Sequence, residues 1–245
     1  ASRLALSQCP GGFHAIMTAL VIEPISSSNW DKPQALGLHV RVMGSISIPA
    51  VVLAAGHSRR LGRHKALVAV NGKELVWWVH ERLVSAGCTP VVVVNAEIES
   101  DVARLLPGAH LVVNPNPDAG RTGSLQLGIE ALEMMMEAKL ERLVMAPVDR
   151  PGWNSEVLQT LLEEREDSAP SFDGRKGHPV VLCSSAIEVV RKAESHHPLR
   201  DLVVFNPVAV KAPWLHLNID TEDDVALLES NNPALLACFP QGEGI

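Results

Sequence analysis

Residues 48–65 read Ile48-Pro49-Ala50-Val51-Val52-Leu53-Ala54-Ala55-Gly56-His57-Ser58-Arg59-Arg60-Leu61-Gly62-Arg63-His64-Lys65. The run from Ile48 to Leu53 is apolar and predicts a buried strand, and the small and cationic residues behind it predict a loop. In open α/β sheets, ligands bind beyond the carboxyl ends of the strands. The stretch therefore predicts both an α/β fold and the place of its ligand.

Apolar runs and amphipathic stretches continue to alternate along the rest of the chain. Further strands are expected over residues 90–95, 109–113, 142–148, 178–183, 208–211 and 215–219. Helices are expected over residues 74–86, 98–106, 124–139, 154–166 and 184–193, and from Thr221, which can form a capping box with Asp224. Residues between the 154–166 helix and the strand at 178 are expected to form a polar loop. This rhythm indicates βαβ units and a mostly parallel sheet.

The first 46 residues have a different pattern. They lack sustained periodicity and contain breakers such as Pro10-Gly11-Gly12 and Pro24. We expect residues 1–46 to be an extension whose role the sequence does not reveal, and residues 47–245 to form the domain that carries the function.

Composition narrows the function classes. The 245 residues are 47% hydrophobic and 20% charged, which is typical of a globular protein with a full core. The formal net charge of −7 argues against a nucleic-acid partner, since binding a phosphate backbone requires a basic surface. No apolar run reaches the ~18 residues of a membrane helix, and the four scattered cysteines have no zinc or redox spacing. We expect no membrane partner, no secretory signal and a reducing, cytoplasmic setting.

The loop after Leu53 has the chemistry of a phosphate site. Small residues let backbone amides approach phosphate oxygens, Ser58 adds a hydroxyl, and Arg60 and Lys65 add positive charge. The spacing matches neither the Walker motif nor the dinucleotide fingerprint. An exposed basic turn is the alternative interpretation.

The pattern Leu-Ala-Ala-Gly-x-Ser-x-Arg-x-Gly-x-x-Lys resembles the signature of the MobA-like nucleotidyltransferases, in particular the molybdenum cofactor cytidylyltransferase branch. The resemblance implies a three-layer, Rossmann-like fold with a mostly parallel mixed central sheet, in which this loop wraps a triphosphate. It assigns catalytic roles to Lys65 and Arg60. It assigns nucleotide binding to Leu53, Ala54, Ala55, Gly56, Ser58 and Gly62, whereas Arg59, Arg63 and His64 are read as solvated neighbours.

A second segment, residues 114–125, joins an expected strand to a long helix and is similar to the family's Asn-Pro-x-x-x-x-Gly-x-x-x-Ser-Leu element. The match assigns base and ribose contacts to Gly120 and Ser124. Asn114 is either a further contact or a turn former.

Two aspartates follow expected strands. Asp149 matches a family carboxylate that holds Mg²⁺, and the match assigns it a catalytic and a metal-binding role. The alternative interpretation is an aspartate that only forms a turn or a cap. Asp220 resembles a second metal ligand, or it serves only the entry of the last helix. Arg150 departs from the family pattern beside Asp149, which puts acceptor recognition in doubt, and Glu222 stands where the family usually has proline.

Residues 174–180 resemble the Gly-x-x-Gly-His-Pro element of the cytidylyltransferase branch. Arg175, Lys176 and His178 could then meet an anionic acceptor, or the segment could be a hairpin-like turn with His178 bonded to backbone. His196 and His197 are read as a surface loop.

Together these motifs predict Mg²⁺-dependent transfer of a nucleoside monophosphate to a phosphorylated acceptor with release of pyrophosphate. The favoured substrates are CTP, with GTP second, and molybdopterin, and the protein partner would be a molybdoenzyme or its chaperone. The alternatives are a sugar-phosphate or phosphocholine nucleotidyltransferase and a non-catalytic nucleotide-binding relative.

Overall fold

The computed structural model describes residues 47–230 and 232–240. The expected extension, residues 1–46, lies outside the described residues. The strands of the main sheet are β1 (Ile48–Leu53), β4 (Cys88–Val94), β5 (His110–Val113), β6 (Arg142–Pro147), β7 (Ser168–Phe172), β8 (Arg175–Lys176), β9 (Val180–Cys183) and β10 (Asn206–Ala209). They are ordered β10-β7-β9-β6-β1-β4-β5, with β8 paired to β7.

The sheet is mixed but mostly parallel. β1 is parallel to β4 and β6, β4 is parallel to β5, and β10 is parallel to β7. β9 is antiparallel to β6 and β7, and β8 is antiparallel to β7. The register pairs Leu53 with Val93 and Pro147, so three strands end at the same level. The loops that follow β1 and β6 therefore leave the sheet side by side.

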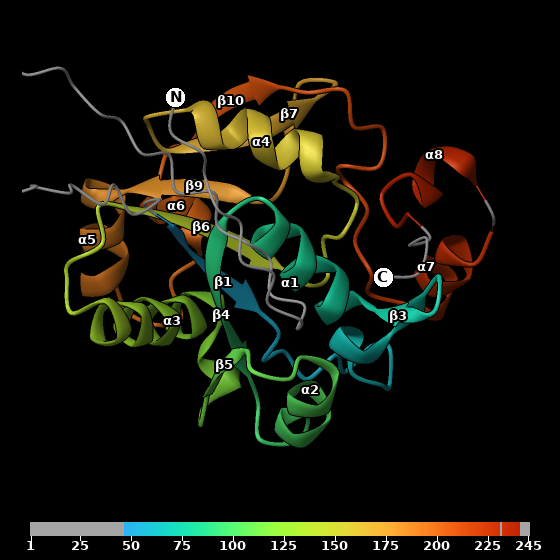
Figure 1. Ribbon diagram of the computed structural model, residues 1–245, viewed down its shortest axis with the longest axis horizontal. Helices are drawn as coiled ribbons and strands as arrows, with labels where there is room; N and C mark the ends of the chain where they lie inside the picture. The colour runs from blue at the N-terminus through green and yellow to red at the C-terminus, as the bar shows by residue number, and fades with distance from the viewer. Residues whose placement is uncertain (1–46, 231, 241–245) are drawn as a thin grey trace, which may run out of the picture. The chain divides into compact units, whose positions relative to one another are not determined.

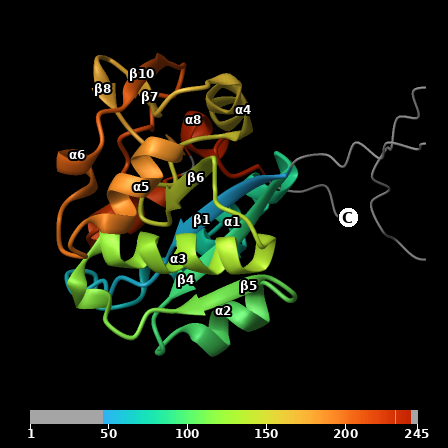
Figure 2. The ribbon, with the colours of Figure 1, turned by 90° about the vertical axis from the view of Figure 1, so that its left-hand side faces the viewer.

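Helices cover both faces of the sheet (Figure 1). The helices are α1 (Leu75–Ser85), α2 (Glu99–Leu105), α3 (Arg121–Met136), α4 (Ser155–Glu163), α5 (Ser184–Lys192) and α6 (Leu199–Leu202). Alternate β1 residues face opposite sides: Val52 packs with α1, α2 and α4, and Val51 packs with α3 and α5. Figure 2 shows α3 and α5 together on the latter face. This arrangement confirms the three-layer α/β prediction.

A third hydrophobic cluster joins the end of the chain to the phosphate-loop region. It contains residues of α7 (Glu222–Leu228), α8 (Pro233–Leu236) and β2 (Ala69–Val70), the strand that pairs with β3 (Lys73–Glu74) in a small hairpin. Leu61, Trp78 and Phe239 are among its buried members. The predicted capping box of α7 is present between Thr221 and Asp224. This cluster places the segment before α7 next to the loop after β1.

Two local predictions are wrong. Residues 215–219 are not a strand, although Leu215, Leu217 and Ile219 are buried in alternation as the pattern required. The supposed polar loop before residue 178 contains the strands β7 and β8, which pair across a turn at Asp173 and Gly174. In the first case the alternation reported burial without strand pairing. In the second case Pro170 in β7 and the two-residue length of β8 left no local pattern that separates this hairpin from a loop.

Within residues 47–230 and 232–240, no helix combines the length and apolarity needed to cross a membrane.

Candidate active site

The loop after β1 folds around Ser58. Ser58 has a φ of 53°, and its carbonyl accepts from the amides of Leu61 at 3.0 Å and Gly62 at 3.1 Å. Its hydroxyl accepts from the Lys65 backbone amide at 3.0 Å. Gly62, with a φ of 71°, supplies the conformation that lets the chain turn back. The turn places the side chain of Lys65 over the ends of β1 and β6.

A cavity of about 240 Å³ lies beside this loop. Nine of the residues assigned from sequence line it: Leu53, Ala54, Ala55, Gly56, Ser58, Lys65, Gly120, Ser124 and Asp149. Arg60 and Asp220 line an adjoining, shallower cavity that Ser58 and Lys65 share. Gly62 lines neither of these two cavities, so its place in the structure is that of a turn residue.

The charged side chains meet in one cluster. Lys65 Nζ lies 2.7 Å from Asp220 Oδ1 and 3.7 Å from Asp149 Oδ2. Arg60 Nη1 donates to Asp220 Oδ2 at 2.6 Å, and Arg121 Nη2 donates to Asp149 Oδ2 at 2.7 Å. The hydrogen bond from Lys65, followed by that from Arg60, lowers the pKa of Asp220 below its usual value. Two acids and three bases thus converge from segments far apart in sequence.

Asp149 has one oxygen that these bases do not use. Its side chain is 12% exposed, and Oδ1 is buried without a hydrogen-bond partner among the described residues. Its carbonyl accepts from Ile219 N at 3.0 Å, which ties the end of β6 to the segment that carries Asp220. A buried carboxylate oxygen without a partner is unfavourable in the free protein, and it is a suitable ligand for a hard cation.

The segment over residues 114–125 also lines the cavity of about 240 Å³. Asn114 is buried, and its Nδ2 donates to Ser124 Oγ at 2.9 Å while its Oδ1 accepts from Asn116 N at 2.8 Å. Asn114 is therefore a turn former that also holds a cavity residue in place. Gly120 has a φ of 108°, and a Cβ on it would lie 3.2 Å from the carbonyl oxygen of Ser195. Glycine at this position permits the close approach of the 194–197 loop.

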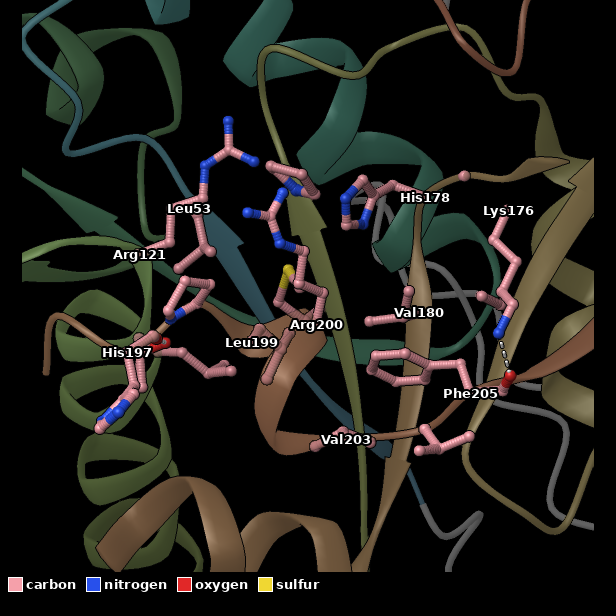
Figure 3. Close-up of a pocket in the computed structure, with 18 of the residues that line it drawn as sticks. Leu53, Arg121, Lys176, His178, Val180, His197, Leu199, Arg200, Val203 and Phe205 are labelled. Atoms are coloured by element: carbon pink, nitrogen blue, oxygen red, sulfur yellow. Dashed lines mark hydrogen bonds between the residues drawn. The ribbon is translucent and has the colours of Figure 1, made fainter. Parts of the chain in front are cut away.

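A larger cavity of about 710 Å³ lies against the first and shares Leu53, Arg121 and Pro147 with it. Figure 3 shows its apolar side chains, such as Val203 and Phe205, and its cationic ones. Two predicted acceptor residues, Lys176 and His178, line it, whereas Arg175 is not among its lining residues. Lys176 Nζ donates to the Phe205 carbonyl at 2.7 Å.

His178 is partly buried at the wall of this larger cavity, and its Nδ1 atom is fully buried. Burial, and then the positive charge of Arg121, lowers its pKa to about 4. Nδ1 has no hydrogen-bond partner among the described residues, so it lacks the backbone bond that the hairpin interpretation gave it. The ring is neutral at physiological pH and cannot contribute a positive charge toward an anionic acceptor.

Of the loop residues predicted to be solvated neighbours, Arg59 and Arg63 are exposed and His64 is partly buried, and all three lie beside acidic side chains. Arg59 donates to both Asp118 oxygens at 2.9 Å, and Arg63 donates to both oxygens of Glu222. His64 Nε2 lies 3.0 Å from Glu97 Oε2. His196 and His197, also read as surface, stack at the rim of the larger cavity, and Glu194 completes an exposed group whose ligand atoms lie within 4.8 Å of one another.

The profile of the MobA-like NTP transferase domain matches residues 50–209. The chain belongs to this family. A molybdenum cofactor guanylyltransferase of Rhizobium leguminosarum bv. trifolii is 28% identical over 216 residues, which cover 80% of this chain and 98% of the relative. A probable molybdenum cofactor guanylyltransferase of Trichormus variabilis is 32% identical over 114 residues, or 46% of this chain, and there the chain spans only 51% of the relative's length.

Solved structures share the fold of this MobA-like protein. A nucleotidyl transferase from Methanothermobacter superposes with a TM-score of 0.60 at 22% identity, over 76% of this chain and all (100%) of that one. The manganese complex of a protein from Mycobacterium tuberculosis H37Rv gives a TM-score of 0.56 at 20% identity, over 75% of this chain and 99% of that chain.

Sequence reasoning missed three residues of this MobA-like site. Arg121 is one of them: the helix was expected to begin at residue 124, which left Arg121 in a loop, whereas it is the first residue of α3. Asn95 stabilises the loop after β1, since its Nδ2 donates to the Ala55 carbonyl at 3.1 Å. Arg82, buried among aromatic rings, donates to the carbonyls of Pro151 at 2.9 Å and Trp153 at 2.6 Å, just beyond Asp149. The position of Arg82 on the apolar side of its helix, four residues after Trp78 and three after Val79, was the only available sign of it.

Proposed function

We propose that this MobA-like protein transfers CMP from CTP, with Mg²⁺, to the phosphate of a molybdopterin-type acceptor and releases pyrophosphate. The observation that carries the proposal is the position of Lys65, between Asp149 and Asp220 and at the edge of the cavity under the Ala54-Ala55-Gly56 loop. Cations and carboxylates at the carboxyl ends of parallel strands suit a triphosphate with its metal.

The carboxylates fit a divalent cation. Asp149 offers its partnerless Oδ1, and Asp220 lies on the other side of Lys65. Mg²⁺ prefers one or two carboxylates together with phosphate oxygens and water. When bound, the cation neutralises part of the triphosphate charge. The manganese complex of the mycobacterial structure, whose fold this chain shares, supports the choice of a divalent ion.

The chain's own residues position the reactants and offset charge. Backbone amides of the loop and the cations Arg60 and Lys65 would hold the triphosphate. An oxygen of the acceptor phosphate forms a bond to the α-phosphorus, the bond from that phosphorus to the bridging oxygen breaks, and pyrophosphate leaves. Negative charge grows on the leaving group, and Lys65 and Arg60 are placed to stabilise it. No nucleophilic side chain is needed.

The nucleotide is proposed from the loop and from the Gly177-His178-Pro179 element, both of which resemble the cytidylyltransferase branch. The curated relatives carry guanylyltransferase names, which makes GTP the competing substrate. CTP and GTP differ in the base alone, so competition at equal concentration separates them without a change in the acceptor.

The acceptor is proposed from the larger cavity. Its volume of about 710 Å³ lies in the usual range for small-molecule sites, and it combines an apolar floor with the cations Lys176 and Arg200. An acceptor with a flat heterocycle and a phosphate matches that combination. The cavity adjoins the nucleotide side, as a bond between the two substrates requires.

The test is pyrophosphate release by purified protein with Mg²⁺, in which CTP, GTP, UTP and ATP are each offered with molybdopterin and with a panel of sugar phosphates. We expect release with CTP and molybdopterin, and an Asp149→Asn variant should abolish turnover while leaving nucleotide binding measurable. Release with GTP instead would overturn the nucleotide, and release with a sugar phosphate would overturn the acceptor. Nucleotide binding without any release would support a non-catalytic relative.

A further inference from the structure

Arg121 carries a positive charge at a position where the dipole of its helix disfavours one. It is the first residue of α3, and the first turn of α3 contains no acidic residue. The N-terminus of a helix carries partial positive charge, so a cation there is disfavoured unless an anion lies nearby. The position of Arg121 therefore points to an anion at this end of α3.

The anion beside Arg121 in the structure is Asp149, and this ion pair uses only one nitrogen of the guanidinium. Arg121 Nη2 donates to Asp149 Oδ2 at 2.7 Å, and its other N–H groups have no hydrogen-bond partner among the described residues. The Arg63–Glu222 pair, in contrast, uses two guanidinium nitrogens and both carboxylate oxygens. The Arg121 side chain is 55% exposed. The guanidinium thus keeps most of its donors available to a further anion.

Arg121 also lies where the two cavities meet. Three residues line both cavities, Leu53, Arg121 and Pro147, and Arg121 is the only charged one among them. Figure 3 shows Arg121 in the same part of the larger cavity as Arg200 and His178, away from Phe205. A group that passes from a nucleotide in the smaller cavity to an acceptor in the larger one must cross this boundary.

We propose that Arg121 is a phosphate-binding residue of the transfer reaction, held on Asp149 until a divalent cation takes that carboxylate and then bound to the acceptor phosphate. The inference rests on the proposed function. With a divalent cation held by Asp149, the adjacent Arg121 guanidinium would be repelled from that carboxylate, and two oxygens of the acceptor phosphate at the cavity boundary would become its partners. A planar guanidinium grips two phosphate oxygens at once, which an ammonium group does not.

The first arm of the test needs no substrate. Binding of Mn²⁺ alone to the full chain is measured by the loss of the electron paramagnetic resonance signal of the free ion. Arg121→Met removes the competitor for Asp149 and should tighten Mn²⁺ binding about threefold to tenfold. Arg104→Met, an exposed arginine of α2 that pairs with Asp101, is the matched control and should leave the affinity unchanged. Unchanged or weaker Mn²⁺ binding in Arg121→Met overturns the exchange at Asp149.

The second arm measures turnover. Arg121→Met should lower kcat about 100-fold and raise the KM of the acceptor while the KM of the nucleotide stays within about twofold. Arg121→Lys should restore part of kcat but not the acceptor KM. An unchanged acceptor KM in both variants overturns the phosphate role. If wild-type protein turns over no substrate pair yet Arg121→Met binds Mn²⁺ more tightly, the proposed function fails and the Arg121–Asp149 exchange stands.

Discussion

Acidification should destabilise this protein through His178. The imidazole is half-buried beside the larger cavity, and its pKa falls from the ordinary 6.5 to about 4, chiefly because loss of contact with water disfavours the charged form. Between these two values the unfolded chain binds a proton at this residue and the folded chain does not. Stability is therefore highest above pH 6.5 and is lost as the pH falls toward 4.

The magnitude follows from the two pKa values. Each unit of difference corresponds to about 1.4 kcal/mol, so the full loss is about 3 kcal/mol at pH 4 and below, and about 2 kcal/mol is already lost at pH 5. The pKa of Glu133 is lowered to about 2 by its hydrogen bond to Arg191. Protonation of Glu133 also lowers the stability of the folded protein, but mostly below pH 4.5. Between pH 7 and pH 5, the loss of stability from His178 is therefore separated from that of Glu133.

Urea unfolding at pH 7 and pH 5 checks the prediction. Wild-type protein should lose about 2 kcal/mol more than His178→Gln, which cannot be protonated. His110→Gln, at an exposed histidine of β5, should behave as wild type. Equal losses for wild type and His178→Gln would refute the reasoning, because they would mean that His178 is protonated equally easily in the folded and unfolded chain.

Three further substitutions test other parts of the structure. Lys65→Met should slow pyrophosphate release about 100-fold, whereas Lys192→Met, at an exposed lysine, should not; equal rates would remove Lys65 from the reaction. Arg82→Met leaves buried carbonyls without a donor and should lower the free energy of unfolding in urea by about 2–4 kcal/mol; a smaller loss would mean that water replaces the guanidinium. Thr221→Ala removes the cap of α7 and should cost about 1 kcal/mol in thermal unfolding, and no change would contradict a stabilising cap.

The central sheet could be read from the sequence because its strands are buried on both faces. β1, β4 and β6 are continuous apolar runs between amphipathic helices, a pattern that few other folds produce. The edge of the sheet was harder. β7 contains Pro170 and forms a hairpin with a strand of two residues, so no local pattern separates it from a loop. The antiparallel direction of β9 likewise depends on a long-range pairing.

The candidate site was predictable where its chemistry follows the chain. The phosphate loop is one continuous stretch, and most of its assigned residues line a single cavity. The ion pairs were not predictable, because Arg121 reaches Asp149 and Lys65 reaches Asp220 through the tertiary fold. The pKa of His178 depends on burial by neighbours that no spacing reveals.

The distance along the chain between Lys65 and Asp220 has a consequence for biosynthesis. The two residues bond at 2.7 Å but are 155 positions apart. At roughly 5–20 residues per second, a ribosome needs about 8–30 s to make Asp220 after Lys65. Throughout that interval the cations of the phosphate loop lack this carboxylate and are free to attract any polyanion, including the ribosomal RNA beside which the nascent chain emerges.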